Sequence, residues 1–163
     1  MNSTSVGVDL AKQVFAVCVG DERGHGGKLS VMKRDEFLKW LTTLPAGTVV
    51  AMEACSAAHD WGRTMQAMGL VPKLMAPEFV KPYRKNQRVK NDNRDAEAIL
   101  TALHAPKMRF IAVKTMEQQQ RLAWHRLREG WKAERTALFN RIRDCLPRLA
   151  SSSKSAPLKF GAS

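Results

Sequence analysis

The sequence predicts an α/β domain that is built on a five-stranded mixed sheet and is followed by one long helix. Short runs rich in β-branched residues dominate the first third of the chain, and runs with helical periodicity alternate with them from residue 34 onward. Residues 115–146 then carry one continuous helical pattern. The hydrophobic share of 44% is enough to build a core, so the composition does not indicate general disorder.

Three β-rich runs open the chain and predict an antiparallel meander. They are residues 4–10, 13–20 and 28–32, with the Gly-rich turn "DERGHGG" before the third run. Because a parallel crossover needs a dozen or more residues, strands spaced this closely pair most economically as antiparallel neighbours. Residues 48–53 and 71–76 predict two further strands. The first of these is apolar on both faces, which is typical of a central parallel strand.

Helical periodicity accounts for the segments between and after these strands. The predicted helices are residues 34–44, 57–68 and 92–105. Ser56 is expected to cap the second helix, and Pro77 is expected to open a short, interrupted helical stretch. The resulting order, β-β-β-α-β-α-β-α, is that of the ribonuclease H-like fold. Right-handed crossovers then place the strand 48–53 beside the strand 4–10.

The charge balance favours a polyanionic partner. The formal net charge is +12 and the isoelectric point is about 10.1, which favours DNA, RNA or an anionic surface. No apolar run approaches the ~20 residues of a membrane span, and the N-terminus lacks the pattern of a signal peptide. The three widely spaced cysteines form neither a disulfide framework nor a zinc motif. We therefore expect a cytoplasmic protein without a membrane partner.

Four carboxylates fall at positions that this order of elements makes convergent. Asp9 lies near the end of the first strand and Glu53 ends the fourth, so neighbouring strand ends would bring the two together. Asp92 and Asp95, at positions i and i+3, share one face of the helix 92–105. Carboxylate oxygens suit Mg²⁺ or Mn²⁺, and a pair of such metals can act on a phosphodiester. The pattern predicts a catalytic, metal-binding tetrad.

Each of these carboxylates also has an ordinary structural role. Asp9 could be a turn residue at a strand end, and Glu53 could be a solvated strand end. Asp92 could be the N-cap of its helix, and Asp95 could be a first-turn acid that complements the helix dipole. Taken singly, the two helix roles outweigh metal binding. The combination of four acids at convergent positions favours the metal site.

A basic stretch, residues 81–90, precedes the last two acids. We expect it to contact the phosphate backbone, with an aromatic ring available to stack on an exposed base. The residues assigned to nucleic-acid binding are Lys81, Tyr83, Arg84, Lys85, Arg88 and Lys90. A solvated loop is the alternative for this stretch.

The predicted helix 115–146 carries an apolar stripe close to heptad spacing. The stripe consists of Trp124, Leu127, Trp131, Leu138 and Ile142. A helix of this length is too long to be hidden against a small domain, so we expect a coiled-coil contact with a second subunit. Folding back onto its own domain is the alternative. The predicted organisation is residues 1–110 as the acidic domain, 111–148 as the long helix and 149–163 as a disordered tail.

The acidic motifs and the long helix resemble a known family. "GVDLAKQVFAV", "AMEAC" and "VKNDNRDAEAIL" are similar to N-terminal motifs of the DEDD transposases, the Piv-like insertion-sequence family numbered one hundred and ten. "WKAERTALFNRIRDCL" resembles the helix that follows that domain. The resemblance implies a RuvC-like domain whose divalent-metal tetrad falls on Asp9, Glu53, Asp92 and Asp95. It also implies DNA transposition by an oligomer that is guided by a structured RNA.

The C-terminal residues depart from the family pattern. Family members carry a second domain with a serine that attacks DNA, whereas this sequence ends in "LASSSKSAPLKFGAS". We expect a copy that is truncated before that domain and that does not recombine DNA on its own. The tail is expected to hold no nucleophile among its serines, Ser151, Ser152, Ser153 and Ser155.

Three other functions compete with that of a transposase domain. A non-catalytic fragment that binds nucleic acid or regulates assembly shares every feature except turnover. A RuvC-like or ribonuclease H-like nuclease acting alone would need only the acidic domain. An actin-like sugar kinase shares the strand order, but Ala11, Lys12 and Gln13 supply neither the glycine nor the hydroxyl that its phosphate loop needs.

Overall fold

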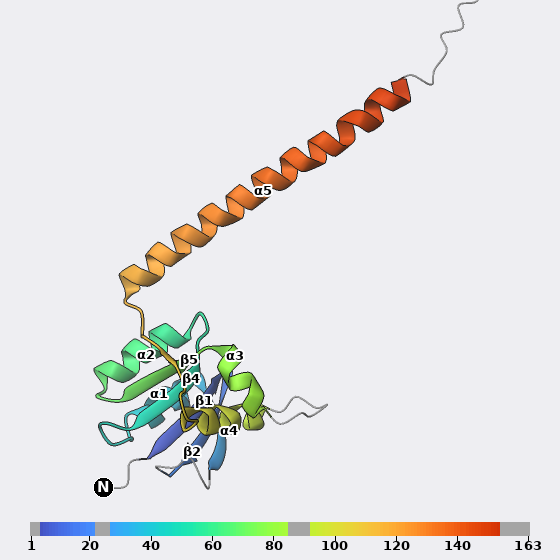
Figure 1. Cartoon of the computed structure of the whole chain (residues 1–163). Helices are drawn as coiled ribbons and strands as arrows, with labels where there is room; N and C mark the ends of the chain where they lie inside the picture. Colours follow the sequence, from blue (N-terminus) through green and yellow to red (C-terminus); the bar gives the residue numbers. More distant parts are fainter. Residues whose placement is uncertain (1–3, 22–26, 85–91, 154–163) are drawn as a thin grey trace, which may run out of the picture. The chain divides into compact units, whose positions relative to one another are not determined.

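The chain forms two structural units. The computed structural model describes residues 4–21, 27–84 and 92–153 (Figure 1). The units divide between Thr115 and Met116. The first is a mixed α/β domain, and the second contains the single helix α5, Met116–Ser153.

A six-stranded sheet forms the centre of the first unit, in the order β3-β2-β1-β4-β5-β6. Its strands are β1 (Ser5–Leu10), β2 (Val14–Gly20), β3 (Lys28–Lys33), β4 (Val49–Glu53), β5 (Val71–Met75) and β6 (Phe110–Ile111). The antiparallel meander β1-β2-β3 and the parallel pairing of β4 with β1 agree with the expectation from the sequence. The arrangement is consistent with the ribonuclease H-like fold.

The predicted count of five strands is wrong for the described residues, because β6 adds a sixth. Phe110 pairs with Met75, and Ile111 pairs with Leu74, in an antiparallel ladder. Two residues are too few to show alternation, so no periodic signal could reveal this strand. Its identity as a strand depends on β5 being beside it.

Helices cover both faces of the sheet in the first unit. They are α1 (Arg34–Leu41), α2 (Ala58–Ala67), α3 (Pro77–Val80), the short 3-10 helix η1 (Lys81–Tyr83) and α4 (Asp92–Leu103). Pro77 opens α3 as expected. Ser56 does not cap α2: the N-cap is Ala57, and it makes no side-chain hydrogen bond. The chain turns into the helix one residue later than predicted, so the serine is no longer at the cap.

Two apolar layers fix which helix lies on which face. Phe37 of α1 and Trp61 of α2 meet Phe15 of β2 edge to face, with ring centroids 5.0 and 5.3 Å from the Phe15 ring. On the opposite side, α4 packs Ile99 and Leu100 against small residues of the strands. The sheet is therefore sandwiched between α1 with α2 on one face and α4 on the other.

Helix α5 runs past residue 148, where we expected the long helix to end, and stops at Ser153. It therefore includes Ser151, Ser152 and Ser153, whereas Ser155 and the rest of the expected disordered tail lie outside the described residues. Within the described part of the chain, no helix is both long and apolar enough to cross a membrane.

Candidate acidic centre

Asp9 and Glu53 lie side by side at the carboxyl ends of two parallel strands. Val8 of β1 is opposite Met52 of β4, so the two acids are the next residues along neighbouring strands. Both are half-buried. The sheet therefore brings the ends of these two strands together, as the sequence predicted.

Both acids belong to the face of the sheet that α4 covers. Side chains alternate between the faces of a strand, so Gly7 and Asp9 share one face of β1, and Ala51 and Glu53 share one face of β4. Ala51 packs in the same apolar cluster as Ile99 of α4. The strand pleat therefore directs both carboxylates to the side from which α4 supplies its own acids.

Gly7 allows α4 to approach the sheet closely. A Cβ atom at this position would lie 2.4 Å from the Ala96 carbonyl oxygen and 2.7 Å from the Leu100 backbone nitrogen. A glycine inside a strand often marks such a close backbone approach. The glycine itself was the sequence signal for this positioning residue, which was not among the predicted site residues. Ala96 directly follows Asp95, so the contact at Gly7 brings that acid to the sheet.

Arg84 connects the strand and helix parts of the acidic centre. Its Nη2 atom donates a hydrogen bond to Glu53 Oε1 at 2.5 Å. Its Nε atom lies 3.1 Å from Asp95 Oδ1. The two carboxylates are each 18% exposed, and the arginine side chain is 37% exposed. A partly buried cation thus bridges two carboxylates that come from separate elements.

The pKa of Glu53 reports the crowding of charge in this centre. Burial raises this pKa above its ordinary value, and it outweighs the lowering effect of the Arg84 charge and hydrogen bond. The negative charges of Asp9 and Asp95 raise the pKa of Glu53 further. Glu53 therefore interacts electrostatically with two of the other three predicted acids. Such a cluster favours any cation that offsets the repulsion.

The fourth predicted acid, Asp92, begins α4, but its side chain lies outside the described part of the chain. Among the side chains that are described, no group of three or more His, Cys, Asp or Glu residues is arranged to hold a metal ion. The chemistry of the donor set nevertheless fits a hard divalent cation, because it consists of carboxylate oxygens and already holds the positive charge of Arg84. The complete tetrad remains a prediction.

The basic stretch is only partly described. Lys81 and Tyr83 are exposed on η1, directly before Arg84. Lys85, Arg88 and Lys90 lie outside the described residues. The prediction placed Arg84 against nucleic acid, whereas the structure places it against two carboxylates.

The apolar stripe predicted for the long helix lies on α5. Its residues, Trp124, Leu127, Trp131, Leu138 and Ile142, are all exposed within their own unit. Trp124 and Trp131 are the largest of these side chains, with 68% and 61% of their surface accessible.

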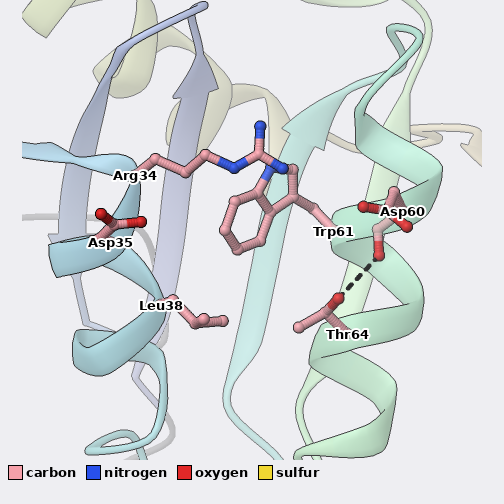
Figure 2. A pocket seen from close by; sticks show the side chains of 6 residues that line it. All are labelled: Arg34, Asp35, Leu38, Asp60, Trp61 and Thr64. Carbon is pink, nitrogen blue, oxygen red and sulfur yellow. Dashed lines mark hydrogen bonds between the residues drawn. The ribbon is translucent and has the colours of Figure 1, made fainter.

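A pocket of about 200 Å³ lies between α1 and α2, on the sheet face opposite α4 (Figure 2). Arg34 of α1 extends over the ring of Trp61 of α2, with its guanidinium carbon 5.3 Å from the ring centroid. The Nε1 atom of Trp61 is buried and has no hydrogen-bond partner among the described residues. The cation–π contact joins the two helices, and the sheet separates this pocket from the acidic centre.

His59 of α2 binds the last residues of the first unit. The backbone N–H of Lys114 donates to His59 Nδ1 at 3.2 Å, and Arg63 Nη1 donates to the Lys114 carbonyl at 2.7 Å. Burial lowers the pKa of His59, and the positive charges of Lys114 and Arg63 lower it further. Sequence spacing could not find this contact, because the two residues are 55 positions apart.

Curated relatives of this chain are named as transposases. The chain is 43% identical over 146 residues to "Probable family 20 transposase" of Pseudomonas aeruginosa, covering 90% of this chain and 42% of the relative. It is 43% identical over 141 residues to "Transposase for insertion sequence element IS1111A" of Coxiella burnetii, covering 86% and 38%. It is 36% identical over 141 residues to "Transposase for insertion sequence element IS1328" of Yersinia enterocolitica, covering 86% and 41%.

The family model for DEDD transposases of the IS110 type, described as "Transposase", matches residues 6–150. The chain belongs to this family and corresponds to its N-terminal region. It spans about two fifths of the length of the curated relatives that it matches. The family resemblance identified from the three acidic motifs is thereby confirmed.

Proposed function

We propose that this chain is the RuvC-like, metal-dependent part of a DNA transposase and that it acts on the phosphodiesters of mobile DNA. The observation that supports this most strongly is the contact of Arg84 with both Glu53 and Asp95, because it joins a strand end and a helix in one acidic centre. The family membership supplies the reaction class. The relatives' names support DNA as the partner.

In this proposal, four carboxylates hold the divalent cation, Mg²⁺ or Mn²⁺. They are Asp9, Glu53, Asp92 and Asp95. When bound, such a cation would polarise a phosphodiester and favour attack by a nucleophile. The chain's own contribution is to hold the carboxylates on two strand ends and one helix, where the backbone fixes their positions.

Nucleic acid would reach this centre along the basic stretch. Lys81 and Tyr83 are exposed next to Arg84, and the net charge of +12 attracts a polyanion at long range. The other proposed contacts are Lys85, Arg88 and Lys90. A structured guide RNA is a second proposed partner, which rests on the family resemblance.

Helix α5 would form a coiled coil with a second copy of the chain. Its exposed stripe, Trp124, Leu127, Trp131, Leu138 and Ile142, is the proposed contact surface. Burying each such side chain contributes about 1.5–3 kcal/mol, which offsets part of the entropy lost on association. The serine chemistry that the family resemblance implies is not part of the function proposed for this chain.

Calorimetric titration with Mn²⁺ tests the metal centre. The wild-type chain should bind Mn²⁺ and melt at a higher temperature in its presence, because a cation relieves carboxylate repulsion and binds only the folded state. The double variant Asp9→Asn with Asp92→Asn should lose this binding. Glu117→Gln is the control, because Glu117 is an exposed acid on α5. Equal Mn²⁺ affinity in the wild type and the double variant would refute the proposed metal centre.

A further inference from the structure

Arg84 contacts two carboxylates of the acidic centre, but only one of these contacts is a hydrogen bond. One donor, Nη2, makes a hydrogen bond to Glu53 Oε1. The Nε atom faces Asp95 Oδ1 at 3.1 Å, but it is buried and has no hydrogen-bond partner among the described residues. The ion pair therefore lacks hydrogen-bonding alignment. A buried donor without a partner costs free energy, so another arrangement of this guanidinium can compete with the observed one.

A divalent cation and Arg84 would interact with the same carboxylates. The oxygens that Arg84 contacts belong to two of the acids proposed as metal ligands. Two positive groups at one pair of carboxylates repel each other, so each weakens the binding of the other. Once released, the guanidinium matches a phosphate as well as it matches a carboxylate, because its planar fork can donate two parallel hydrogen bonds to either.

We propose that Arg84 is an exchangeable counter-ion of the acidic centre, which moves from Glu53 and Asp95 to a DNA phosphate when a divalent cation binds. This inference rests on the proposed metal-dependent function. It makes cation binding and DNA binding cooperative: the cation frees the arginine for DNA, and DNA holds the arginine away from the carboxylates. Arg84 thus binds the carboxylates when no cation is present and binds a DNA phosphate when a cation is bound.

The first test compares Mn²⁺ affinity without DNA. Arg84→Ala should lower the Kd for Mn²⁺ roughly tenfold, because the cation no longer has to displace a bound charge. Arg109→Ala is the matched control: Arg109 is an exposed arginine of the same unit without a carboxylate contact among the described residues, and its loss should leave the Kd within about twofold. Arg84→Gln repeats the test in case the alanine variant does not fold.

The second test measures the coupling between Mn²⁺ and a single-stranded oligodeoxythymidylate. The oligonucleotide should increase Mn²⁺ affinity of the wild type and of Arg109→Ala, and Mn²⁺ should increase oligonucleotide affinity by the same factor. The enhancement should largely disappear in Arg84→Ala. An enhancement by oligouridylate but not by oligodeoxythymidylate would overturn the assignment of the partner as DNA.

The outcomes separate this inference from the proposed function. If the wild type and both Arg84 variants fail to bind Mn²⁺, the metal centre itself is wrong. If the wild type binds Mn²⁺ while Arg84→Ala binds it equally or more weakly, Arg84 only supports the carboxylates and the exchange is refuted. Undiminished coupling in Arg84→Ala would refute it as well.

Discussion

Replacing Gly7 with alanine should separate α4 from the sheet and disturb the acidic centre. The added Cβ would lie 2.4 Å from the Ala96 oxygen, 2.7 Å from the Leu100 nitrogen and 2.9 Å from the Leu100 Cβ. Relaxed contacts between heavy atoms lie at about 3.5–4.0 Å, so the helix would have to shift by roughly 1 Å. Two of the three clashing atoms are backbone, and a rotamer change therefore cannot relieve the strain.

The expected cost is about 1–3 kcal/mol in the free energy of unfolding, which is typical of overpacking. The reduced freedom of the unfolded chain returns about 0.4–1 kcal/mol of this, because alanine is less flexible than glycine. Since Asp95 precedes Ala96 on the shifted helix, Mn²⁺ affinity should fall as well. Urea denaturation followed by circular dichroism, and titration with Mn²⁺, measure the two effects.

Gly130→Ala is the control for this substitution. Gly130 lies inside α5, and no described atom lies within 4 Å of a Cβ built there, apart from the helix backbone and its chain neighbours. Alanine at this site should preserve or raise helix stability by up to about 1 kcal/mol. If Gly7→Ala retains both the wild-type unfolding free energy and the wild-type Mn²⁺ affinity, the close approach of α4 does not position Asp95.

Three further predictions concern pH, assembly and salt. The pKa of His59 is lower in the folded chain than in the unfolded chain. As the pH falls, His59 is therefore protonated in the unfolded chain before it is protonated in the folded chain, and the free energy of unfolding should fall as the pH drops through about 6.5. His59→Asn should flatten this dependence in urea titrations between pH 7.5 and 5.5, and an unchanged slope would contradict the assignment. Light scattering should detect a smaller assembly after three substitutions on α5, namely Trp131→Ala, Leu138→Ala and Ile142→Ala; a wild-type monomer would exclude the proposed coiled coil. DNA affinity should fall steeply with salt, with a log–log slope that becomes flatter by roughly one unit for each lost phosphate contact. The substitutions that test it are Arg84→Ala, Lys85→Ala and Arg88→Ala, and a salt-insensitive affinity would count against phosphate binding.

Local pattern was enough to predict most of the secondary structure of the first unit. β1 to β5 lie where the sequence predicted short strands, and α1, α2 and α4 lie where helical periodicity predicted helices. The limits of these elements were less predictable: Ser56 does not cap α2, and β6 has no pattern of its own. Element ends depend on where the chain turns against its neighbours, which a periodic pattern does not record.

The sequence by itself also determined which side chains the acidic centre can contain. Asp9 is the penultimate residue of its strand and Glu53 is the last residue of its own, and a parallel pairing of those strands makes the two acids neighbours. The acidic motifs were specific enough to identify the family. The sequence also shows Gly7 as a glycine inside a predicted strand, but only the structure shows that its missing side chain lets Ala96 of α4 approach the sheet.

Only the tertiary structure decided how the charges pair. The charge pattern places Arg84 in a basic stretch, but its partner Glu53 lies 31 positions earlier on β4 and its partner Asp95 lies on α4. The contact of His59 with Lys114 is equally remote in sequence. The physical reason is that periodicity encodes which face of an element is apolar, whereas the partner of a charged side chain depends on the packing of separate elements. At Arg84, that packing turns a residue expected to bind phosphate into the counter-ion of two carboxylates.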